Sequence, residues 1–367
     1  KMIMLEQNSK EIHVYVGTYT NSSNNKGIYV YRINSDSGAL EFVSTTEGIE
    51  NPSFLDIDSQ RKHLYSVNEV GEFSGEASGA VTAFSIDSKT GKLTYLNQQS
   101  SQGKGPCHLS VDKTGQYVLV ANYGEGSVSI LPIQRDGQIG EATDFVQHQG
   151  SSVNQNRQQE PHAHSIMIDP NNRYAFAADL GVDKILIYQL DLAAGKLIPN
   201  EHPWVSITPG AGPRHFAFTP NGEYAYLINE LDSTITAFTY DNSQGNLNQI
   251  QTVPTLPDDF EDVSHCADIH VSPSGKFVYG SNRGHDSLVI FKIEDTGHLS
   301  YVDHQLTLGQ NPRNFAIDPT GTFLLAANQS TNNIVTFRID QQTGKLTSTG
   351  NIVEVPMPVC IKMIYLP

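Results

Sequence analysis

The chain has 367 residues, 17% of them charged and 38% hydrophobic, and 23 Lys and Arg against 39 Asp and Glu give it a formal net charge of −16. Such a charge repels nucleic acid and anionic membrane surfaces, and no apolar run approaches the roughly 18 residues that a membrane-spanning helix needs. We therefore expect a soluble protein whose partners include no nucleic acid and no membrane. Any site for an anion has to be a small local pocket.

The cysteines indicate the compartment. Cys107, Cys266 and Cys360 are odd in number, lie far apart and show no Cys-x-x-Cys spacing, which argues against a disulfide framework and favours a reducing environment. The first ten residues lack the apolar segment and cleavage site of a secretory signal. The sequence predicts a cytoplasmic protein, with the cysteines as apolar core residues.

One pattern repeats along the whole chain. A Gly-x-Leu/Ile motif recurs seven times, and its first and last glycines, Gly38 and Gly344, are six repeats apart, so the mean period is about 51 residues. The glycines of the motif are Gly38, Gly91, Gly137, Gly195, Gly245, Gly297 and Gly344. A period of this length indicates a repeat architecture rather than several unrelated domains.

Within each period, the elements in chain order are short strands. The segments that begin at Pro52, Pro106, His162, Pro213, His265 and Pro312 each show an alternating apolar run, a turn with Pro, Gly or Asn, a second run that ends near an Asn, and further alternation. Period-two alternation of Tyr, Val, Ile, Phe and Thr predicts antiparallel strands, about four to a repeat. Four-stranded sheets of this kind stack radially into a β-propeller.

The two ends of the sequence give the number of blades. Residues His13 to Tyr19 match the second strand of a repeat, and Pro358 to Pro367 match the first strand. We predict an all-β fold, a seven-bladed β-propeller whose C-terminal strand completes the N-terminal blade, as a single domain over residues 1–367. An open solenoid is the alternative, but it would leave two raw sheet edges.

The propeller has two rims, and the long loops fall on one of them. Insertions at residues 71–79, 147–160 and 254–263 lie on the rim where first strands begin and second strands end, whereas the other rim carries tight turns. Loop elaboration on one face of a repeat scaffold usually marks the binding face, although neutral drift of surface loops would look the same.

At that rim, two rings of residues surround the mouth of the central channel. The residues that open the first strands are Ser53, Cys107, His164, Arg214, Ala267, Arg313 and Val359, and those at the ends of the second strands are Tyr19, Glu69, Tyr123, Leu180, Glu230, Arg283 and Gln329. Three arginines, a histidine and a carboxylate thus come from consecutive blades. Cations exceed carboxylates among them, which favours an anionic ligand, while an ion-pair network that only ties blades together is the structural alternative.

These residues also carry a family likeness. The segments His164 to Pro170, Pro213-Arg214, Ile228 to Glu230 and Ser281 to Arg283 resemble those of the seven-bladed lactonase family, which includes bacterial 6-phosphogluconolactonases and the fungal carboxy-cis,cis-muconate lactonizing enzyme. The resemblance covers essentially the whole chain. It implies that His164, Arg214, Glu230 and Arg283 are the catalytic residues.

The resemblance implies a hydrolase that opens a sugar lactone, of the 6-phosphogluconolactonase type. In that reading His164 and Glu230 divide the base and acid roles, because a histidine titrates near neutrality and a carboxylate among arginines stays ionised. The arginines stabilise the oxyanion. We expect these further residues to contact the substrate: Arg313, the natural partner of a phosphate, and His162, His215, Glu69 and Gln329.

Two other functions remain open at this stage. A cycloisomerase of the lactonizing type would use the same scaffold for a substrate with several carboxylates, and a non-catalytic propeller would bind protein partners through an exposed apolar patch on a rim. We expect no cofactor. A metal site built on His162 and His164, with His215, His265, Asp268 and His285 near, is disfavoured because the spacing is unlike a tight zinc site. The expected partner is a small anionic lactone or sugar phosphate, and the oligomeric state is left open between a monomer and a weak dimer.

Overall fold

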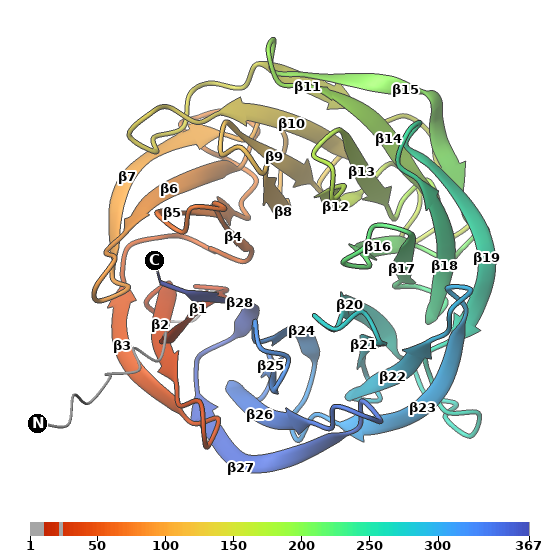
Figure 1. The fold of residues 1–367 in the computed structure, drawn as a ribbon. Helices are drawn as coiled ribbons and strands as arrows, with labels where there is room; N and C mark the ends of the chain where they lie inside the picture. The colour runs from red at the N-terminus through yellow and green to blue at the C-terminus, as the bar shows by residue number, and fades with distance from the viewer. Residues whose placement is uncertain (1–10, 22–24, 367) are drawn as a thin grey trace, which may run out of the picture.

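The structure is a computed structural model that describes residues 11–21 and 25–366, and in these residues every regular element is a β-strand. The 28 strands form seven four-stranded antiparallel sheets arranged around a central opening (Figure 1). No helix in this part of the chain is long and apolar enough to cross a membrane. The seven-bladed propeller predicted from the repeat is confirmed.

Each blade runs from an innermost strand at the opening to an outermost strand at the periphery. From the centre outward, blade 1 is β28 (Pro358–Tyr365), β1 (Ile12–Thr18), β2 (Ile28–Ile33) and β3 (Leu40–Thr46); blade 2 is β4 (Leu55–Ile57), β5 (His63–Asn68), β6 (Ala80–Ile86) and β7 (Leu93–Ser100); blade 3 is β8 (Pro106–Val111), β9 (Tyr117–Asn122), β10 (Ser127–Pro132) and β11 (Asp144–Gln147). Blade 4 is β12 (Ala163–Ile168), β13 (Tyr174–Asp179), β14 (Lys184–Asp191) and β15 (Lys196–Ser206); blade 5 is β16 (Pro213–Phe218), β17 (Tyr224–Asn229), β18 (Thr234–Asp241) and β19 (Asn246–Pro254). Blade 6 is β20 (His265–Val271), β21 (Phe277–Arg283), β22 (Ser287–Ile293) and β23 (Leu299–Leu306), and blade 7 is β24 (Pro312–Ile317), β25 (Phe323–Asn328), β26 (Asn333–Ile339) and β27 (Leu346–Glu354).

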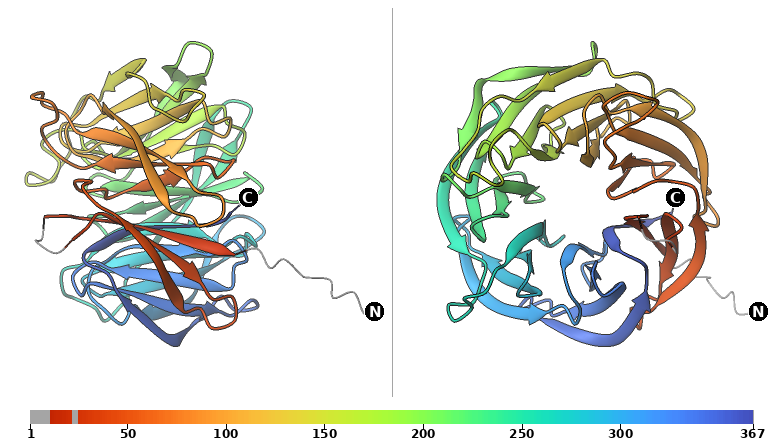
Figure 2. Two further views of the ribbon diagram at one scale, coloured as in Figure 1. Left: turned by 90° about the vertical axis from the view of Figure 1, so that its left-hand side faces the viewer. Right: turned by 180° about the vertical axis from the view of Figure 1, so that it is seen from behind.

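The ring closes inside blade 1. Strand β28 pairs antiparallel with β1, with Ile12 opposite Tyr365 and Val16 opposite Ile361. The C-terminal strand therefore completes the N-terminal blade, as the sequence predicts, and Figure 2 shows the closed ring from its edge and from behind. Closure by backbone hydrogen bonds removes the two open sheet edges that a solenoid would leave.

The repeated glycine holds neighbouring blades together. Each of the seven glycines has a φ between 66° and 90°, in the left-handed region that glycine tolerates, and its α-carbon faces the ring of a residue at the start of the second strand of the preceding blade. A Cβ on Gly297 would lie 2.3 Å from the Tyr224 ring, so no larger residue fits. The Gly297 carbonyl also accepts a hydrogen bond from the Tyr226 hydroxyl at 2.8 Å. The 51-residue period is thus the signature of a contact between blades.

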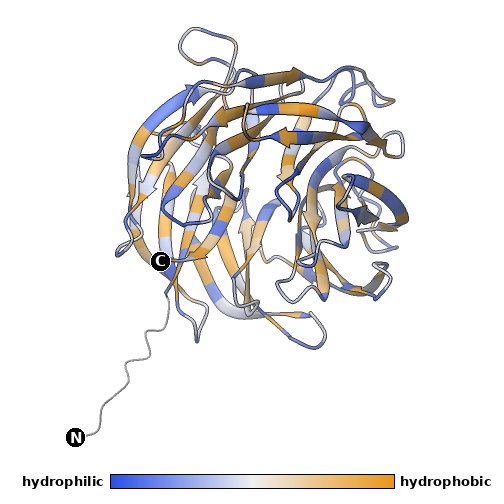
Figure 3. Cartoon of the chain, turned by 45° about the horizontal axis from the view of Figure 1, so that its top comes forward, coloured by the Kyte–Doolittle hydropathy of each residue, from blue (hydrophilic) through white to orange (hydrophobic). Residues whose placement is uncertain are grey.

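Apolar side chains are buried between the blades rather than within any one of them. One cluster joins blades 4 and 5 through Phe176, Phe216 and Phe238, which are at most 3% exposed. The outermost strands, such as β3 and β27, consist mostly of exposed and half-buried residues, whereas most inner strands are buried on both faces. Figure 3 shows this as hydrophobic bands along the strands and hydrophilic loops at the rims. The rigid, packed ring leaves the channel mouth as the place where polar side chains gather.

Candidate functional site

The backbone itself turns the ring residues toward the channel mouth. Where β16 pairs with β17, Pro213 is opposite Asn229 and His215 is opposite Ile228, so Arg214 is an extra residue, a β-bulge. The same register shift leaves Cys107, His164 and Arg313 unpaired in β8, β12 and β24. A bulge re-aims the side chain of its extra residue. The fold therefore directs the side chains of Cys107, His164 and Arg313 into the same space, and that of Arg214 to a buried position next to it.

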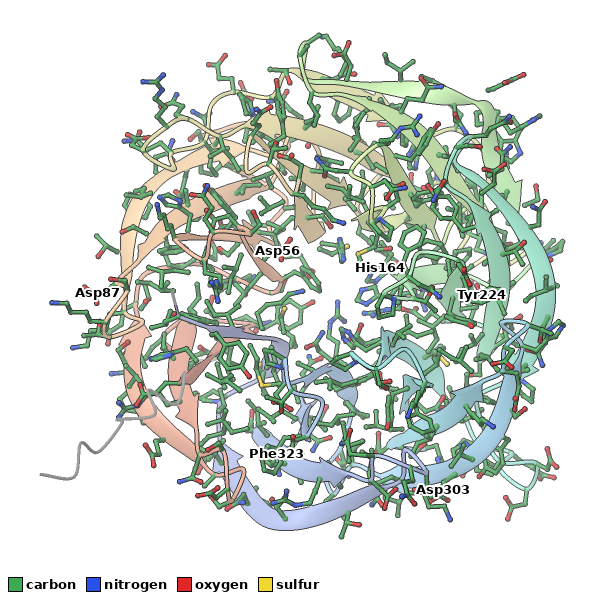
Figure 4. The ribbon with its side chains drawn as sticks, viewed as in Figure 1. Asp56, Asp87, His164, Tyr224, Asp303 and Phe323 are labelled. Carbon is green, nitrogen blue, oxygen red and sulfur yellow. The ribbon has the colours of Figure 1, made fainter. Side chains whose placement is uncertain are left out.

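That space is a cavity of about 340 Å³ at this rim. It is lined by Tyr19, Glu69, Gly105, Cys107, Tyr123, Gly124, Arg157, His164, Glu230, His265, Arg283 and Arg313. Figure 4 shows His164 beside the central opening. Residues from all seven blades thus meet in one cavity, although they are far apart in the sequence.

Glu230 is the centre of an arginine cluster. Its Oε1 accepts hydrogen bonds from Nε of Arg214 at 3.0 Å and from Nη2 of Arg283 at 2.9 Å, and its Oε2 accepts one from Nη2 of Arg157 at 2.5 Å. The Glu230 side chain is only 5% exposed. A buried carboxylate with three charged partners holds the three guanidinium groups close together.

The cluster sets the ionisation of its members. Burial alone would raise the pKa of Glu230, but the charges of Arg283, Arg214 and Arg157 outweigh it and hold that pKa well below its usual range. Burial and the neighbouring arginine charges lower the pKa of Arg214 to about 9, which keeps it a cation at pH 7. Glu230 therefore stays ionised and is a weak proton acceptor.

His164 is a neutral imidazole in this site. Burial and the charge of Arg214 lower its pKa well below 6.5, so the expectation that His164 titrates near neutrality is wrong for the site without a ligand. Its Nδ1 lies 3.7 Å from Sγ of Cys107, and Nε2 has no hydrogen-bond partner among residues 11–21 and 25–366. A free imidazole nitrogen beside a cavity can accept a proton from a bound water.

The opposite side of the cavity holds Arg313, Tyr19 and Glu69. The Arg313 guanidinium lies over the Tyr19 ring, 5.4 Å from its centroid, and no described residue forms a hydrogen bond or ion pair with it. Glu69 instead accepts hydrogen bonds from the Tyr19 hydroxyl at 2.8 Å and from Ser53 at 3.1 Å. Burial would lower the pKa of Arg313, but nearby Tyr19 and Glu69 raise it, so Arg313 is a half-buried cation.

Four of the predicted site residues do not line the cavity. Arg214, 1% exposed, lies behind Glu230 and donates to the Ala267 carbonyl at 2.6 Å. His215 lies deeper and is bonded to Asp268 at 2.8 Å, and the His162 ring is stacked on Tyr123. Gln329 is half-buried at the end of β25 and makes no side-chain hydrogen bond with the described residues. Direct substrate contact by these four has no support in the geometry.

Other residues lie in the cavity although they were not predicted as site residues. They are Arg157, Tyr19, Tyr123, Cys107 and His265. Arg157 comes from the 147–160 insertion, so the position of that loop on the binding rim was the available signal. Tyr19, Tyr123 and Cys107 stand in the two rings but carry no charge that would single them out. Burial raises the pKa of the Cys107 thiol, which argues against a nucleophile.

The cavity offers no metal centre. Within the described residues, no group of three or more His, Cys, Asp or Glu side chains is arranged to hold a metal ion. The two His164 neighbours that could contribute are engaged elsewhere, since His162 Nδ1 is bonded to the Tyr123 carbonyl at 2.7 Å and His215 to Asp268. The chemistry available here comes from an imidazole, a carboxylate and guanidinium groups.

Known proteins share this architecture along their whole length. The family model described as lactonase, 7-bladed beta-propeller, matches residues 13–363. The chain is 39% identical over 352 residues to a 6-phosphogluconolactonase of Bacillus subtilis, and this alignment covers 96% of the chain and 98% of the relative. It is 40% identical over 337 residues to a 6-phosphogluconolactonase of Formosa agariphila, in an alignment that covers 91% of the chain and 94% of the relative. The solved structure of a periplasmic gluconolactonase of Pseudomonas aeruginosa superposes with a TM-score of 0.91 at 33% identity, covering 97% of this chain and 100% of that chain. The chain therefore belongs to the seven-bladed β-propeller lactonase family.

Proposed function

We propose that the protein hydrolyses the lactone ester of a phosphorylated sugar lactone, 6-phosphogluconolactone, in the cavity around Glu230. One observation carries the proposal: a neutral imidazole, an arginine pair held by a carboxylate, and an arginine without a carboxylate partner share one cavity. The names of the relatives support the same substrate. Family membership supports a lactone.

His164 is the proton carrier in this proposal. Nε2 accepts a proton from a water as the water oxygen forms a bond to the lactone carbonyl carbon, and the carbonyl oxygen becomes an oxyanion. The oxyanion then collapses, the bond from that carbon to the ring oxygen breaks, and the ring oxygen takes the proton back from His164. The product is a hydroxy acid, whose carboxyl group loses its proton to solvent at neutral pH.

Glu230 and the arginines supply the electrostatic part. Glu230 keeps Arg283 in place with its remaining guanidinium donors near the cavity, and Arg283 stabilises the oxyanion. The anionic substrate also acts on His164, because a negative charge near an imidazole raises its pKa. A base that is too weak in the free enzyme becomes stronger when the substrate is bound.

Arg313 recognises the phosphate in this arrangement. It is a cation without a carboxylate partner in the described part of the chain, and a phosphate can accept two parallel hydrogen bonds from a guanidinium. Glu69 and Tyr19 are placed to bond the sugar hydroxyls, since both line the same side of the cavity. The lactone carbonyl then faces His164 and Arg283.

A turnover assay tests the proposal. Freshly made 6-phosphogluconolactone is given to the wild type and to His164→Gln, with the spontaneous hydrolysis rate subtracted. We expect enzyme-dependent hydrolysis by the wild type and a loss of about a hundredfold in kcat for the variant, the scale of one general base. Equal rates for the two proteins would remove His164 from the mechanism. Turnover of a carboxymuconate but of no lactone would favour the lactonizing reaction instead.

The compartment is a separate proposal. The cysteines at 107, 266 and 360 are free and buried, which is compatible with the cytoplasm. The Pseudomonas aeruginosa relative is described as periplasmic, so the periplasm is the alternative location that has to be tested. Fractionation of cells that carry the complete native gene distinguishes the two locations.

A further inference from the structure

The three arginines on Glu230 differ in how firmly they are held. Arg214 is 1% exposed and has further partners in the Ala267 carbonyl and His215. Arg283 is 16% exposed and also donates to the Cys266 carbonyl at 3.0 Å. Arg157 is 36% exposed, and among the described residues its only hydrogen-bond partner apart from Glu230 is the Tyr123 hydroxyl, at 3.3 Å. Arg157 is therefore the member of the cluster that can change partner with the least disturbance.

Hydrogen bonds on both sides of Arg157 anchor the backbone of the loop that carries it. Gln158, fully buried, donates a hydrogen bond to the Leu180 carbonyl at 2.8 Å and its Oε1 accepts one from the Asn154 backbone. The Asn154 side chain accepts hydrogen bonds from the backbone of residues 156 and 157, which closes the turn. Ser152 bonds Asp183 in the neighbouring blade. The backbone is thus anchored on both sides of Arg157, while the side chain reaches into the cavity.

We infer that Arg157 is a further catalytic residue of this site: its guanidinium leaves Oε2 of Glu230 for the lactone oxyanion as that charge develops, and then pairs with the carboxylate of the product. The inference rests on the proposed lactone hydrolysis. It follows from where the reaction makes charge, because the carbonyl oxygen gains a negative charge next to the cluster and the product keeps a carboxylate there. An arginine matches a carboxylate through two parallel hydrogen bonds.

The exchange also explains why Glu230 needs a third arginine. Arg214 and Arg283 already occupy its Oε1, and Arg157 occupies Oε2. When Arg157 moves to the oxyanion, Oε2 becomes free to accept a hydrogen bond from the substrate hydroxyls. The cluster therefore contains one guanidinium, that of Arg157, that can pair with the negative charge formed on the substrate during turnover.

The experiment compares Arg157→Gln and Arg157→Lys with the wild type, and uses the exposed Arg135→Gln as the matched control. The measured quantities are kcat and KM for 6-phosphogluconolactone and for glucono-δ-lactone, and the inhibition constants of 6-phosphogluconate and of glucitol 6-phosphate, which has the phosphate but no carboxylate. Thermal unfolding reports the folded state. We expect Arg157→Gln to lower kcat about a hundredfold with both lactones, on the scale of one lost oxyanion donor.

The inhibitors separate this role from a structural one. We expect Arg157→Gln to weaken 6-phosphogluconate about tenfold and to leave glucitol 6-phosphate within twofold, with Arg157→Lys restoring part of kcat. A kcat within twofold of the wild type, or equal weakening of both inhibitors, overturns the inference. If the wild type hydrolyses neither lactone, the proposed function fails, and the oxyanion role of Arg157 fails with it. Calorimetry with 6-phosphogluconate then tests the pairing of Arg157 with a carboxylate: weaker binding to Arg157→Gln supports that pairing, and equal binding, or binding to neither protein, overturns it.

Discussion

The two sides of the cavity treat positive charge in different ways. On the side of blades 5 and 6, Arg214 and Arg283 form ion pairs with the buried Glu230. On the side of blades 1, 2 and 7, Arg313 stands over Tyr19 with no ion pair in the described part of the chain, and Glu69 is occupied by hydroxyl donors. An arginine in an ion pair is held in a fixed position, whereas an arginine without an ion pair can bind an anionic ligand. The comparison therefore assigns the chemical step to the side of Glu230, the paired side, and substrate binding to the side of Arg313, the recognition side.

The largest effect should come from Glu230→Gln, which destroys the paired side. The variant leaves arginines crowded in a buried site without their carboxylate, and breaking a buried ion pair from one end costs about 3–5 kcal/mol. We expect a clear fall in the thermal unfolding midpoint together with near-complete loss of lactone hydrolysis. The exposed Glu141→Gln is the control. An unchanged midpoint would show that the arginines do not depend on Glu230.

Arg283→Ala removes one arginine from the paired side and leaves Glu230 in place. Glu230 keeps Arg214 and Arg157, while the cavity loses one donor for the oxyanion. We expect kcat/KM for the phosphorylated lactone to fall by about 10²–10³, the cost of one such donor. Steady-state kinetics on folded protein measures it. Near-normal turnover would remove Arg283 from the chemistry and with it the assignment of this side.

Acid should weaken the paired side through the histidines beneath it. Burial, with neighbouring positive charge, lowers the pKa of His215 to about 4 and the pKa values of His108 and His164 well below 6.5. Between these values and 6.5 the unfolded chain binds protons that the folded protein does not, so stability is full above pH 6.5 and is lost as the pH falls.

The size of the acid effect follows from the same shift. At about 1.4 kcal/mol per pKa unit, His215 alone contributes up to about 3 kcal/mol of lost stability by pH 4. Denaturant unfolding at several pH values measures this slope. His215→Gln should flatten it, whereas the exposed His202→Gln should not. A slope that is the same in His215→Gln and in the wild type would contradict the assignment.

The smallest effect concerns the recognition side. Arg313→Gln removes the guanidinium expected to bind phosphate, and a charged hydrogen bond of this kind is worth about 1.5–3 kcal/mol. We expect KM for 6-phosphogluconolactone to rise tenfold or more and to rise less for glucono-δ-lactone, which has no phosphate. Steady-state kinetics with the two substrates measures the difference. Equal changes in KM for the two lactones would show that Arg313 does not bind the phosphate and acts instead on the part that the two substrates share.

The fold could be predicted because its signals are local and repeated. Alternating strands, turn residues and the Gly-x-Leu/Ile motif recur with one period, and each glycine reports a contact that the structure shows directly, such as Gly297 on Tyr224. The partial repeats at the two ends then required the closure of β28 on β1. The architecture therefore follows directly from the repeat and its two partial copies.

The site was less predictable, for physical reasons. Ring position placed His164, Glu230, Arg283, Arg313 and Glu69 at one mouth, and all five line the cavity. Ring position could not tell how deep a side chain lies, so Arg214 was predicted to be catalytic although it does not line the cavity. His215, its neighbour in the chain, was predicted to bind substrate although it is bonded to Asp268 outside the cavity. Nor could it follow a non-repeated loop, which is why Arg157 was missed. The pKa of His164 depends on burial and on Arg214, which no spacing reveals.

The pairing of β28 with β1 has a consequence for how the protein comes to be folded. Blades 2 to 7 are each made of consecutive strands, so they can form one after another as the chain leaves the ribosome. The innermost strand of blade 1, in contrast, is synthesised after all the others, and its partner β1 must wait for it. A contact between segments this distant in sequence is slow to form. Until it forms, the edge of β1 stays open to strands of other chains, and aggregation during synthesis is the hazard that this architecture accepts.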